Sequence, residues 1–483
     1  MSYIAAYGHD KTDSSWRSIY GVQEALAEIY PCIEIGITHL GHIIQKSAGR
    51  KPCVCYTEPM LNLEFIRQYP HVVREGLQRR HDPQGIDELM HLSEQRRGLV
   101  TRCDGLYSAL KPLKESVKAV PVEQRGELSR QVKAMTQDIR QLEVQIVDID
   151  TRLQPLLLAL PNIPHQSVAE TDSELRRWGE PLSFYFAPRP HWELGERLGI
   201  LDFEGGTRIA GSRFVNLKGF GARLERALIS FMLDLHTREH GYTEIMPPFL
   251  ARRSLMVGAG QLPKFEEQVY ACTEDELYLN PTAEVPLVGM HSDSILPPGS
   301  LPLRYVAWTT AFRREAGSSS RQTRGLLRLH QFNKVELFQL VAPQDSYEVM
   351  EQMLGHAEAV LRALELPYRI LALSAANLPF ASAKTLDIEV WMPGQACYVE
   401  ISSVTNCESF QARRANIKYR STTTSRADYV HTLNASGLAL GRTMAALLET
   451  YQQADGSVII PKVLRPYMGV SVLTPEKVTS KAL

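Results

Sequence analysis

Two stretches of apolar residues, spaced alternately by four and three positions, constrain the fold of this chain more than any other feature. They cover residues 99–120 and 128–156, and a short polar break at 121–126 separates them. Steps that average about 3.5 residues keep one apolar seam along a helix, so two such helices can wrap around each other. Because the break is short, the pattern predicts an antiparallel helical hairpin, and Pro112 is expected to kink its first helix.

The faces of this hairpin that lie away from the seam are polar and strongly basic. From the pattern alone, a hairpin packed on the rest of the protein or used for dimerisation is favoured. A solvated arm with basic side chains can also lie along a phosphate backbone, where the release of counterions drives binding. The basic residues are Arg96, Arg97, Arg102, Lys111, Lys114, Lys118, Arg125, Arg130, Lys133 and Arg140.

The length and charge of the chain narrow the class of protein. A chain of 483 residues predicts two or three domains, and a net charge of −1 confines any contact with nucleic acid to a local basic surface. No apolar run approaches the roughly 20 residues of a membrane helix, and the first thirty residues carry no secretory or transit signal. The seven cysteines form no C-x-x-C pair, so reduced thiols in the cytoplasm are expected rather than disulfides or zinc.

Changes in composition divide the chain into four parts. Residues 1–59 form an extension of unknown role; it either precedes a true start at Met60 or is a small added module. Residues 60–165 form the arm domain, and a proline-containing linker over 160–168 leads to a body over 172–470. The residues 471–483 are short of apolar side chains and are expected to be a mobile tail.

The body mixes a long amphipathic helix at 221–240 with strand-like pieces such as LYLNPTAEV and YVEISSV. Strands separated by irregular loops, without a β–α repeat, predict an α+β fold with an antiparallel sheet flanked by helices. The chain has neither a G-x-G-x-x-G after a strand nor a G-x-x-x-x-G-K-[ST], which argues against the commonest other nucleotide-binding folds.

One segment of the body, FRREAGSSSRQTRGLLRLHQFNKVELFQL over 312–340, carries a combination of side chains suited to activating an acid with ATP. Arg313 supplies a guanidinium for a phosphate, Phe332 an aromatic face for a purine, and Glu336 a carboxylate for an amine or a hydroxyl. Far downstream, GLALGRTMAALLE places Arg442 just before a helical pattern. Glycines in front of a helix allow an anion to approach its N-terminus.

The F-R-x-E and G-x-x-x-G-R patterns resemble motifs 2 and 3 of the class II aminoacyl-tRNA synthetases, and the residues between them resemble seryl-tRNA synthetases most. The resemblance runs from about Met60 to Gly469. It implies a class II catalytic domain preceded by a coiled-coil arm that grips tRNA(Ser) by shape. It also implies activation of L-serine with ATP, formation of AMP, and charging of tRNA(Ser) and, where present, selenocysteine tRNA. The segment 226–250 resembles motif 1, which forms a homodimer interface in this family.

The resemblance also implies roles for individual residues. Arg313 would bridge the α-phosphate and the serine carboxylate, Arg442 would clamp a bent γ-phosphate, and Glu400 with Ser403 would hold Mg²⁺. The implied ATP contacts are Arg313, Glu315, Leu329, Phe332, Glu400, Ile401, Ser402, Ser403 and Arg442. The implied L-serine contacts are Thr282, Ala283, Glu284, Arg313, Glu336 and Ser436. Ala435 departs from the glycine of some members and restricts φ there.

Two other functions have to be weighed against an active synthetase. A catalytically silent paralogue would only hold tRNA, but the chain keeps Arg313, Arg442 and Glu400. A ligase that loads amino acids onto a carrier protein belongs to relatives without the long helical arm, which this chain keeps. A housekeeping enzyme and a duplicate that confers resistance to a serine-mimicking antibiotic look alike in sequence.

Overall fold

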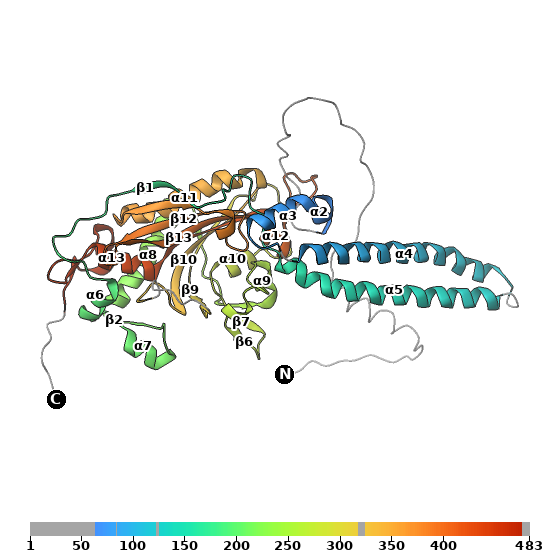
Figure 1. Ribbon diagram of the computed structural model, residues 1–483, viewed down its shortest axis with the longest axis horizontal. Coiled ribbons are helices and arrows are strands. Elements are labelled where there is room, and N and C mark those ends of the chain that lie inside the picture. The colour runs from blue at the N-terminus through green and yellow to red at the C-terminus, as the bar shows by residue number, and fades with distance from the viewer. Residues whose placement is uncertain (1–62, 84, 122–124, 317–323, 476–483) are drawn as a thin grey trace, which may run out of the picture. The chain divides into compact units, whose positions relative to one another are not determined.

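The structure is a computed structural model that describes residues 63–83, 85–121, 125–316 and 324–475. The extension assigned to residues 1–59 and the small-residue loop at 317–320 lie outside these residues. The predicted fold class is confirmed: a helical hairpin precedes a mainly antiparallel sheet with helices packed against it (Figure 1).

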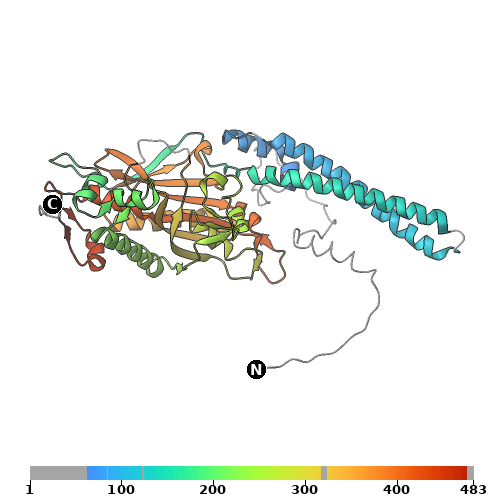
Figure 2. The same ribbon diagram turned by 90° about the horizontal axis from the view of Figure 1, so that it is seen from below.

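The hairpin consists of α4 (Ile86–Ala119) and α5 (Arg125–Ala159), which lie side by side in every view (Figure 2). Its seam buries the predicted apolar residues, with Cys103 and Leu110 of α4 against Ile139 and Leu142 of α5. Burial of such side chains contributes on the order of 1.5–3 kcal/mol each. Pro112, where a kink is expected, lies inside α4 and does not end it.

The base of the hairpin is covered by two short helices, α2 (Leu63–Gln68) and α3 (Pro70–Arg79). Together with the adjoining ends of α4 and α5 they form a second apolar cluster that includes Phe65 and Leu153. The segment 160–168, interpreted as a linker, is packed rather than free. Asn162 is buried, and its Nδ2 donates to the carbonyls of Ala381 (3.0 Å) and Cys407 (2.9 Å).

The body is built on an eight-stranded sheet in which every neighbouring pair is antiparallel except β4 and β9. Its order is β1 (Ser173–Trp178), β11 (Tyr368–Ala372), β12 (Lys384–Met392), β13 (Cys397–Glu408), β16 (His431–Ala439), β10 (Gln331–Val341), β9 (Leu303–Phe312) and β4 (Thr243–Glu244).

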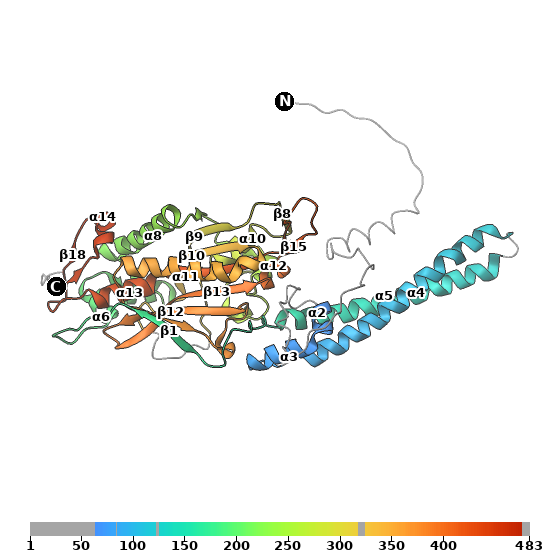
Figure 3. The ribbon, with the colours of Figure 1, turned by 90° about the horizontal axis from the view of Figure 1, so that it is seen from above.

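The three longest helices of the body pack against this sheet (Figure 3): α8 (Phe220–Arg238), α11 (Ser346–Ala363) and α13 (Leu440–Thr450). In α11 the buried positions 349, 350, 353, 354, 357, 360 and 361 recur at helical spacing. This spacing gives one continuous apolar face, which explains why the segment folds as a helix on the sheet. The central strands are buried on both sides and form one core with these helices.

Shorter elements complete the body. Its helices are α6 (His191–Arg197), α7 (Phe203–Ala210), α9 (Arg253–Gly258), α10 (Glu284–Gly289), α12 (Phe410–Arg414) and α14 (Arg465–Met468). Its strands are β2 (Leu201–Asp202), β3 (Asn216–Leu217), β5 (Leu250–Arg252), β6 (Ala271–Cys272), β7 (Leu277–Leu279), β8 (Ser294–Leu296), β14 (Ile417–Tyr419), β15 (Asp428–Tyr429), β17 (Val458–Ile459) and β18 (Val472–Leu473). Because β18 pairs with β17 and Leu473 is buried, the first residues of the segment predicted as a mobile tail are ordered.

Candidate active site

A cavity of about 440 Å³ lies among the central strands and the loops that follow them. It gathers almost every side chain that the sequence analysis selected. From the predicted ATP contacts the lining contains Arg313, Glu315, Leu329, Phe332, Glu400, Ile401, Ser403 and Arg442. From the predicted serine contacts it contains Thr282, Glu284, Glu336 and Ser436 as well.

Two of the selected residues do not line the cavity. Ala283 is fully buried at the start of α10. Ser402 is 1% exposed, and its hydroxyl donates to the carbonyl of Ser436 at 2.6 Å. The contacts predicted for these two residues stay predictions, and in this structure their side chains are buried in the protein and do not line the cavity.

The side chain of Ser402 is turned away by a β-bulge in β13. Glu389 pairs with Glu400, but the preceding residue of β12, Ile388, pairs with Ser402, which leaves Ile401 as an extra residue. A bulge shifts the alternation of side chains by one position. Glu400 and Ser403, which regular alternation would place on opposite faces, therefore both reach the cavity.

A second bulge lies between β10 and β16. Val335 pairs with Leu438 and Glu336 with Ser436, so Gly437 is the extra residue. A Cβ atom on Gly437 would lie 3.0 Å from Nε2 of the buried His236, which is a tight contact that glycine avoids. The bulge sets Glu336 opposite Ser436, and both side chains line the cavity.

Two arginines bring positive charge into the cavity from different motifs. Arg313 is held by a hydrogen bond from its Nε to the carbonyl of Pro281 (3.1 Å), and its guanidinium lies 5.3 Å from the centre of the Phe332 ring. Arg442 donates from Nε to the carbonyl of Leu327 (3.2 Å) and from Nη1 to the carbonyl of Glu400 (2.7 Å). Burial lowers the pKa of Arg313, and so does the positive charge of Arg442. The negative charge of Glu315 acts in the opposite direction but does not outweigh them. A bound anion would relieve the repulsion between the two arginines.

Glu315 reaches the same cavity in an ion pair with Arg328. The carbonyl of Glu315 also accepts a hydrogen bond from Nη1 of Arg213 at 3.3 Å. The backbone of Glu315 has a φ of 49°, in the left-handed region that non-glycine residues seldom adopt. These contacts fix the backbone just after β9, whereas Leu329 lies just before β10 and Phe332 lies within it.

Sequence analysis missed an aspartate beside the predicted magnesium ligands. Asp387 on β12 lines the cavity and accepts a hydrogen bond from the hydroxyl of Ser403 at 2.6 Å. Burial and the neighbouring charge of Glu400 raise the pKa of Asp387 to about 7. The one available signal was strand register, because Asp387 pairs directly with Ser403.

The oxygens of Asp387, Glu400 and Ser403 suit Mg²⁺, a hard cation that prefers carboxylate, hydroxyl and water ligands. The raised pKa of Asp387 reflects its burial first and then the nearby carboxylate of Glu400, whose repulsion a divalent cation would relieve. Among the described residues, no group of three or more His, Cys, Asp or Glu side chains could hold a metal ion by itself. The set therefore fits an ion that also needs oxygens from a substrate or from water.

The other end of the cavity is polar and buried. Glu336 is 1% exposed, accepts a hydrogen bond from Oγ1 of Thr282 (3.2 Å) and forms an ion pair with Lys334. Lys334 is a second residue that the sequence analysis did not select. Glu284 lies nearby, and its Oε1 accepts from Nε2 of Gln411 (2.6 Å) and from Nδ2 of Asn434 (2.8 Å).

Burial and the charge of Glu336 raise the pKa of Glu284 to about 7. Near neutral pH Glu284 is therefore divided between a carboxylate and a neutral acid. The carboxylate acceptors and the neutral acid form of Glu284, which can donate, allow this end of the cavity to bind an ammonium group and a hydroxyl together.

Two family models match this chain. The model of the seryl-tRNA synthetase N-terminal domain matches residues 60–164, and that of the tRNA synthetase class II core domain (G, H, P, S and T) matches residues 265–451. The serine–tRNA ligase of Geobacillus kaustophilus is 49% identical over 425 residues, which are 85% of this chain and 99% of that protein. The chain belongs to the seryl-tRNA synthetase family.

Solved structures agree with this membership. The seryl-tRNA synthetase of Pyrococcus horikoshii complexed with ATP has a TM-score of 0.82 and 34% identity and covers 86% of this chain and 100% of its own. The cytoplasmic serine–tRNA ligase of Naegleria fowleri in complex with AMP has a TM-score of 0.76 and 29% identity and covers 87% of this chain. Among the described residues, every helix of this seryl-tRNA synthetase family member is too short or too polar to cross a membrane.

The raised pKa of Glu284 predicts how the stability of the folded chain depends on pH. In the folded chain the pKa of Glu284 is about 7, whereas the ordinary pKa of a glutamate, which applies to the unfolded chain, is 4.5. Stability should therefore fall as pH rises from 4.5 to 7 and stay low above that. Glu284→Gln removes this loss, so it should stabilise the chain by about 1–3 kcal/mol more at pH 8 than at pH 5.

Urea unfolding of both chains at pH 5 and pH 8 measures this difference. Glu75→Gln, which changes an exposed carboxylate on α3, is the control and should show no such dependence on pH. Equal effects of Glu284→Gln at the two pH values would contradict the assignment of the proton to Glu284.

Proposed function

We propose that this chain activates L-serine with ATP to form seryl-adenylate and then transfers the seryl group to tRNA(Ser). The observation that carries the proposal is one cavity in which Arg313 and Arg442 converge next to a buried polar end formed by Glu336, Thr282 and Glu284. Membership of the seryl-tRNA synthetase family supports the same reaction.

In the first step a carboxylate oxygen of serine attacks the α-phosphorus of ATP. The bond from the α-phosphorus to the α,β-bridging oxygen breaks, and pyrophosphate leaves. The nucleophile is already ionised at neutral pH, so no general base is needed and catalysis depends on positioning and on neutralising charge. In the second step a terminal ribose hydroxyl of the tRNA attacks the seryl carbonyl carbon, AMP leaves, and the hydroxyl proton is released.

Each arginine has a separate task in this scheme. Arg313 would bind the α-phosphate and the serine carboxylate together, since its planar fork suits both groups. Arg442 would bind the γ-phosphate of a bent ATP. Phe332 would stack on the adenine, with Glu315 and the backbone at Leu329 as further contacts. Glu400, Ser403 and Asp387 would hold Mg²⁺, which shields the charge of the phosphates when bound.

Selection of serine would rest on the buried polar end of the cavity. Serine differs from alanine by one hydroxyl, and a site built to bind this hydroxyl leaves its own polar groups unpaired when alanine enters. Glu336 would bind the ammonium group of serine. Thr282, Glu284 and Ser436 surround the place for the side chain, and Lys334 balances the charge of Glu336.

We also propose that the arm formed by α4 and α5 binds tRNA(Ser), and selenocysteine tRNA where it is present. Arg96 is engaged with Asp150 (2.5 Å), Arg97 with Glu94 (2.6 Å) and Arg130 with Glu127 (2.7 Å). Other basic side chains of the arm are exposed and offer a surface to phosphates, whose binding would weaken with salt. These side chains are Arg102, Lys111, Lys114, Lys118, Lys133 and Arg140.

A cytoplasmic location and a homodimer complete the proposal. The segment 226–250, which resembles motif 1, ends in an apolar surface, where Met246 is 81% exposed and Leu250 is 42% exposed. Large apolar side chains at such exposures favour an interface with a second copy. Sedimentation equilibrium of the full chain is the measurement that decides between a monomer and a dimer.

Exchange of pyrophosphate into ATP, measured with each of the twenty amino acids, tests the proposed activation step. Serine should support exchange, and alanine and threonine should support far less. Arg313→Ala should reduce the serine-dependent rate by at least about a thousandfold, because it removes a charge that touches both substrates. Exchange with another amino acid, or near-normal exchange by Arg313→Ala, would contradict the proposal.

Deletion of the arm separates activation from transfer. A chain in which residues 86–158 are replaced by a short glycine–serine linker should keep serine-dependent exchange and lose the charging of tRNA(Ser). Thermal unfolding of the remaining body controls for damage to the fold. Loss of both activities in a chain whose body stays folded would show that the arm is needed for the chemistry itself and not for the tRNA.

A further inference from the structure

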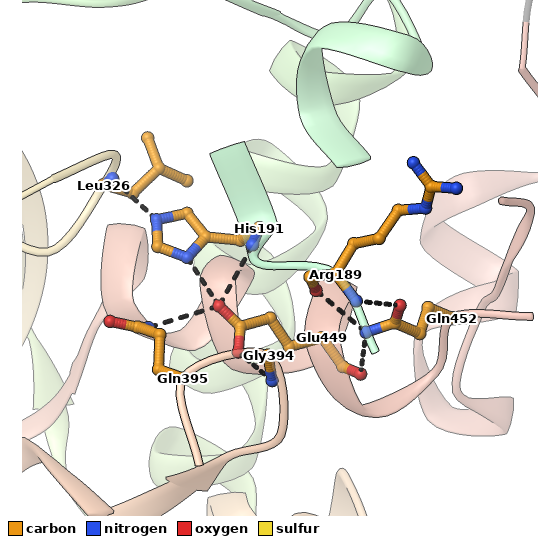
Figure 4. Close-up of polar contacts among 7 residues, drawn as sticks. All are labelled: Arg189, His191, Leu326, Gly394, Gln395, Glu449 and Gln452. Atoms are coloured by element: carbon orange, nitrogen blue, oxygen red, sulfur yellow. Dashed lines mark hydrogen bonds and ion pairs between the residues drawn. The ribbon is translucent and has the colours of Figure 1, made fainter. Parts of the chain in front are cut away.

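A buried histidine outside the cavity lining lies between motif 2 and motif 3. His191 is the first residue of α6 and is fully buried. Its Nδ1 lies 2.8 Å from Oε1 of Glu449 on α13, and its Nε2 lies 2.9 Å from the backbone nitrogen of Leu326 (Figure 4). The imidazole therefore bridges the end of α13 and the motif 2 segment.

The partners of His191 define its tautomer. The backbone N–H of Leu326 can only donate, so Nε2 must accept and the ring proton lies on Nδ1, which donates to Glu449. A Cβ atom on Gly325 would lie 2.2 Å from Nε2, so the absence of a side chain there is what lets the imidazole reach the backbone.

Glu449 is itself held from several sides (Figure 4). Its Oε1 accepts from the backbone N–H of His191 (3.0 Å) and from Nε2 of Gln395 (3.2 Å), and its Oε2 accepts from the backbone N–H of Gly394 (2.8 Å). A buried carboxylate with this number of donors is fixed in one orientation. It presents a rigid acceptor to His191.

The contact at Leu326 is one residue from a contact of the motif 3 arginine. The carbonyl of Leu327 accepts from Nε of Arg442 at 3.2 Å. Arg442 lies in the first turn of α13 and Glu449 seven residues later on the same helix. Residues seven apart lie on one face of a helix, so α13 holds the motif 2 backbone at two neighbouring points, directly through Arg442 at Leu327 and through His191 at Leu326.

We propose that His191 is a positioning residue, which fixes the backbone at Leu326 and Leu327 so that Arg442 is aimed at the phosphates of the nucleotide. The inference rests on the proposed function. Because His191 holds Arg442 and not the serine end of the cavity, its loss should affect the use of ATP and leave the affinity for serine nearly unchanged.

Two substitutions of similar size separate the two hydrogen bonds of the ring. In His191→Gln the side-chain oxygen can reach the position of Nε2 and accept from Leu326. In His191→Asn the side-chain amide ends near the position of Nδ1 and can donate only to Glu449. His191→Gln should keep the KM for ATP within about threefold of the wild type, and His191→Asn should raise it about tenfold or more. The KM for serine should change less than about twofold in both.

Serine-dependent pyrophosphate exchange on the full chain, with thermal unfolding of each variant alongside, provides these values. If the KM for ATP rises equally in the two variants, or if the KM for serine rises as much as the KM for ATP, His191 has only a structural role and the proposal is overturned. Unchanged kinetics in both variants would also overturn it. An inactive wild-type chain would instead overturn the proposed function, and this inference with it.

Gly325→Ala provides a second test that leaves the buried histidine in place. The added methyl group would displace the imidazole from Leu326 and, because φ at Gly325 is 72°, would also strain the backbone there. The KM for ATP should rise about tenfold or more, the change expected for His191→Asn. This test remains available if His191→Asn does not fold. A folded Gly325→Ala variant with the KM of the wild type would contradict the proposal.

Discussion

The arrangement of this protein depends on the hydrogen-bond register of its central antiparallel strands. β10 lies between β9 and β16, and β13 lies on the other side of β16, so segments far apart in the sequence face one cavity. Two bulges, at Gly437 and Ile401, adjust this register by one residue each. Without them Glu336 would not oppose Ser436, and Glu400 and Ser403 would point to opposite faces of the sheet.

The cavity that results holds like charges close together in three places. Arg442 lies near Arg313, Glu400 near Asp387, and Glu336 near Glu284, and Arg313, Asp387 and Glu284 are also largely withdrawn from water. Burial, and after it these like charges, shift the pKa values of Arg313, Asp387 and Glu284. Phosphates, a divalent cation and an ammonium group would each offset one of these repulsions, so the site is adapted to bind all of them.

Much of this could be predicted from the sequence, and the reasons for the exceptions are physical. Helical periodicity predicted the hairpin, and local motifs selected Arg313, Phe332 and Arg442. Pairing register is set by contacts between distant strands, so the sequence could not show that Ser402 turns inward or that Asp387 meets Ser403. The role of His191 could not be predicted for the same reason, because only the fold brings its partners Leu326 and Glu449 next to it.

A crystal structure of the chain with L-serine and α,β-methylene ATP, which cannot release pyrophosphate, would show whether both substrates share this cavity. We expect a bent triphosphate with an α-phosphate oxygen within about 3 Å of a guanidinium nitrogen of Arg313 and a γ-phosphate oxygen equally close to Arg442. The serine hydroxyl should lie at the polar end near Glu284. A triphosphate that binds outside this cavity, or that extends away from Arg442, would contradict this expectation.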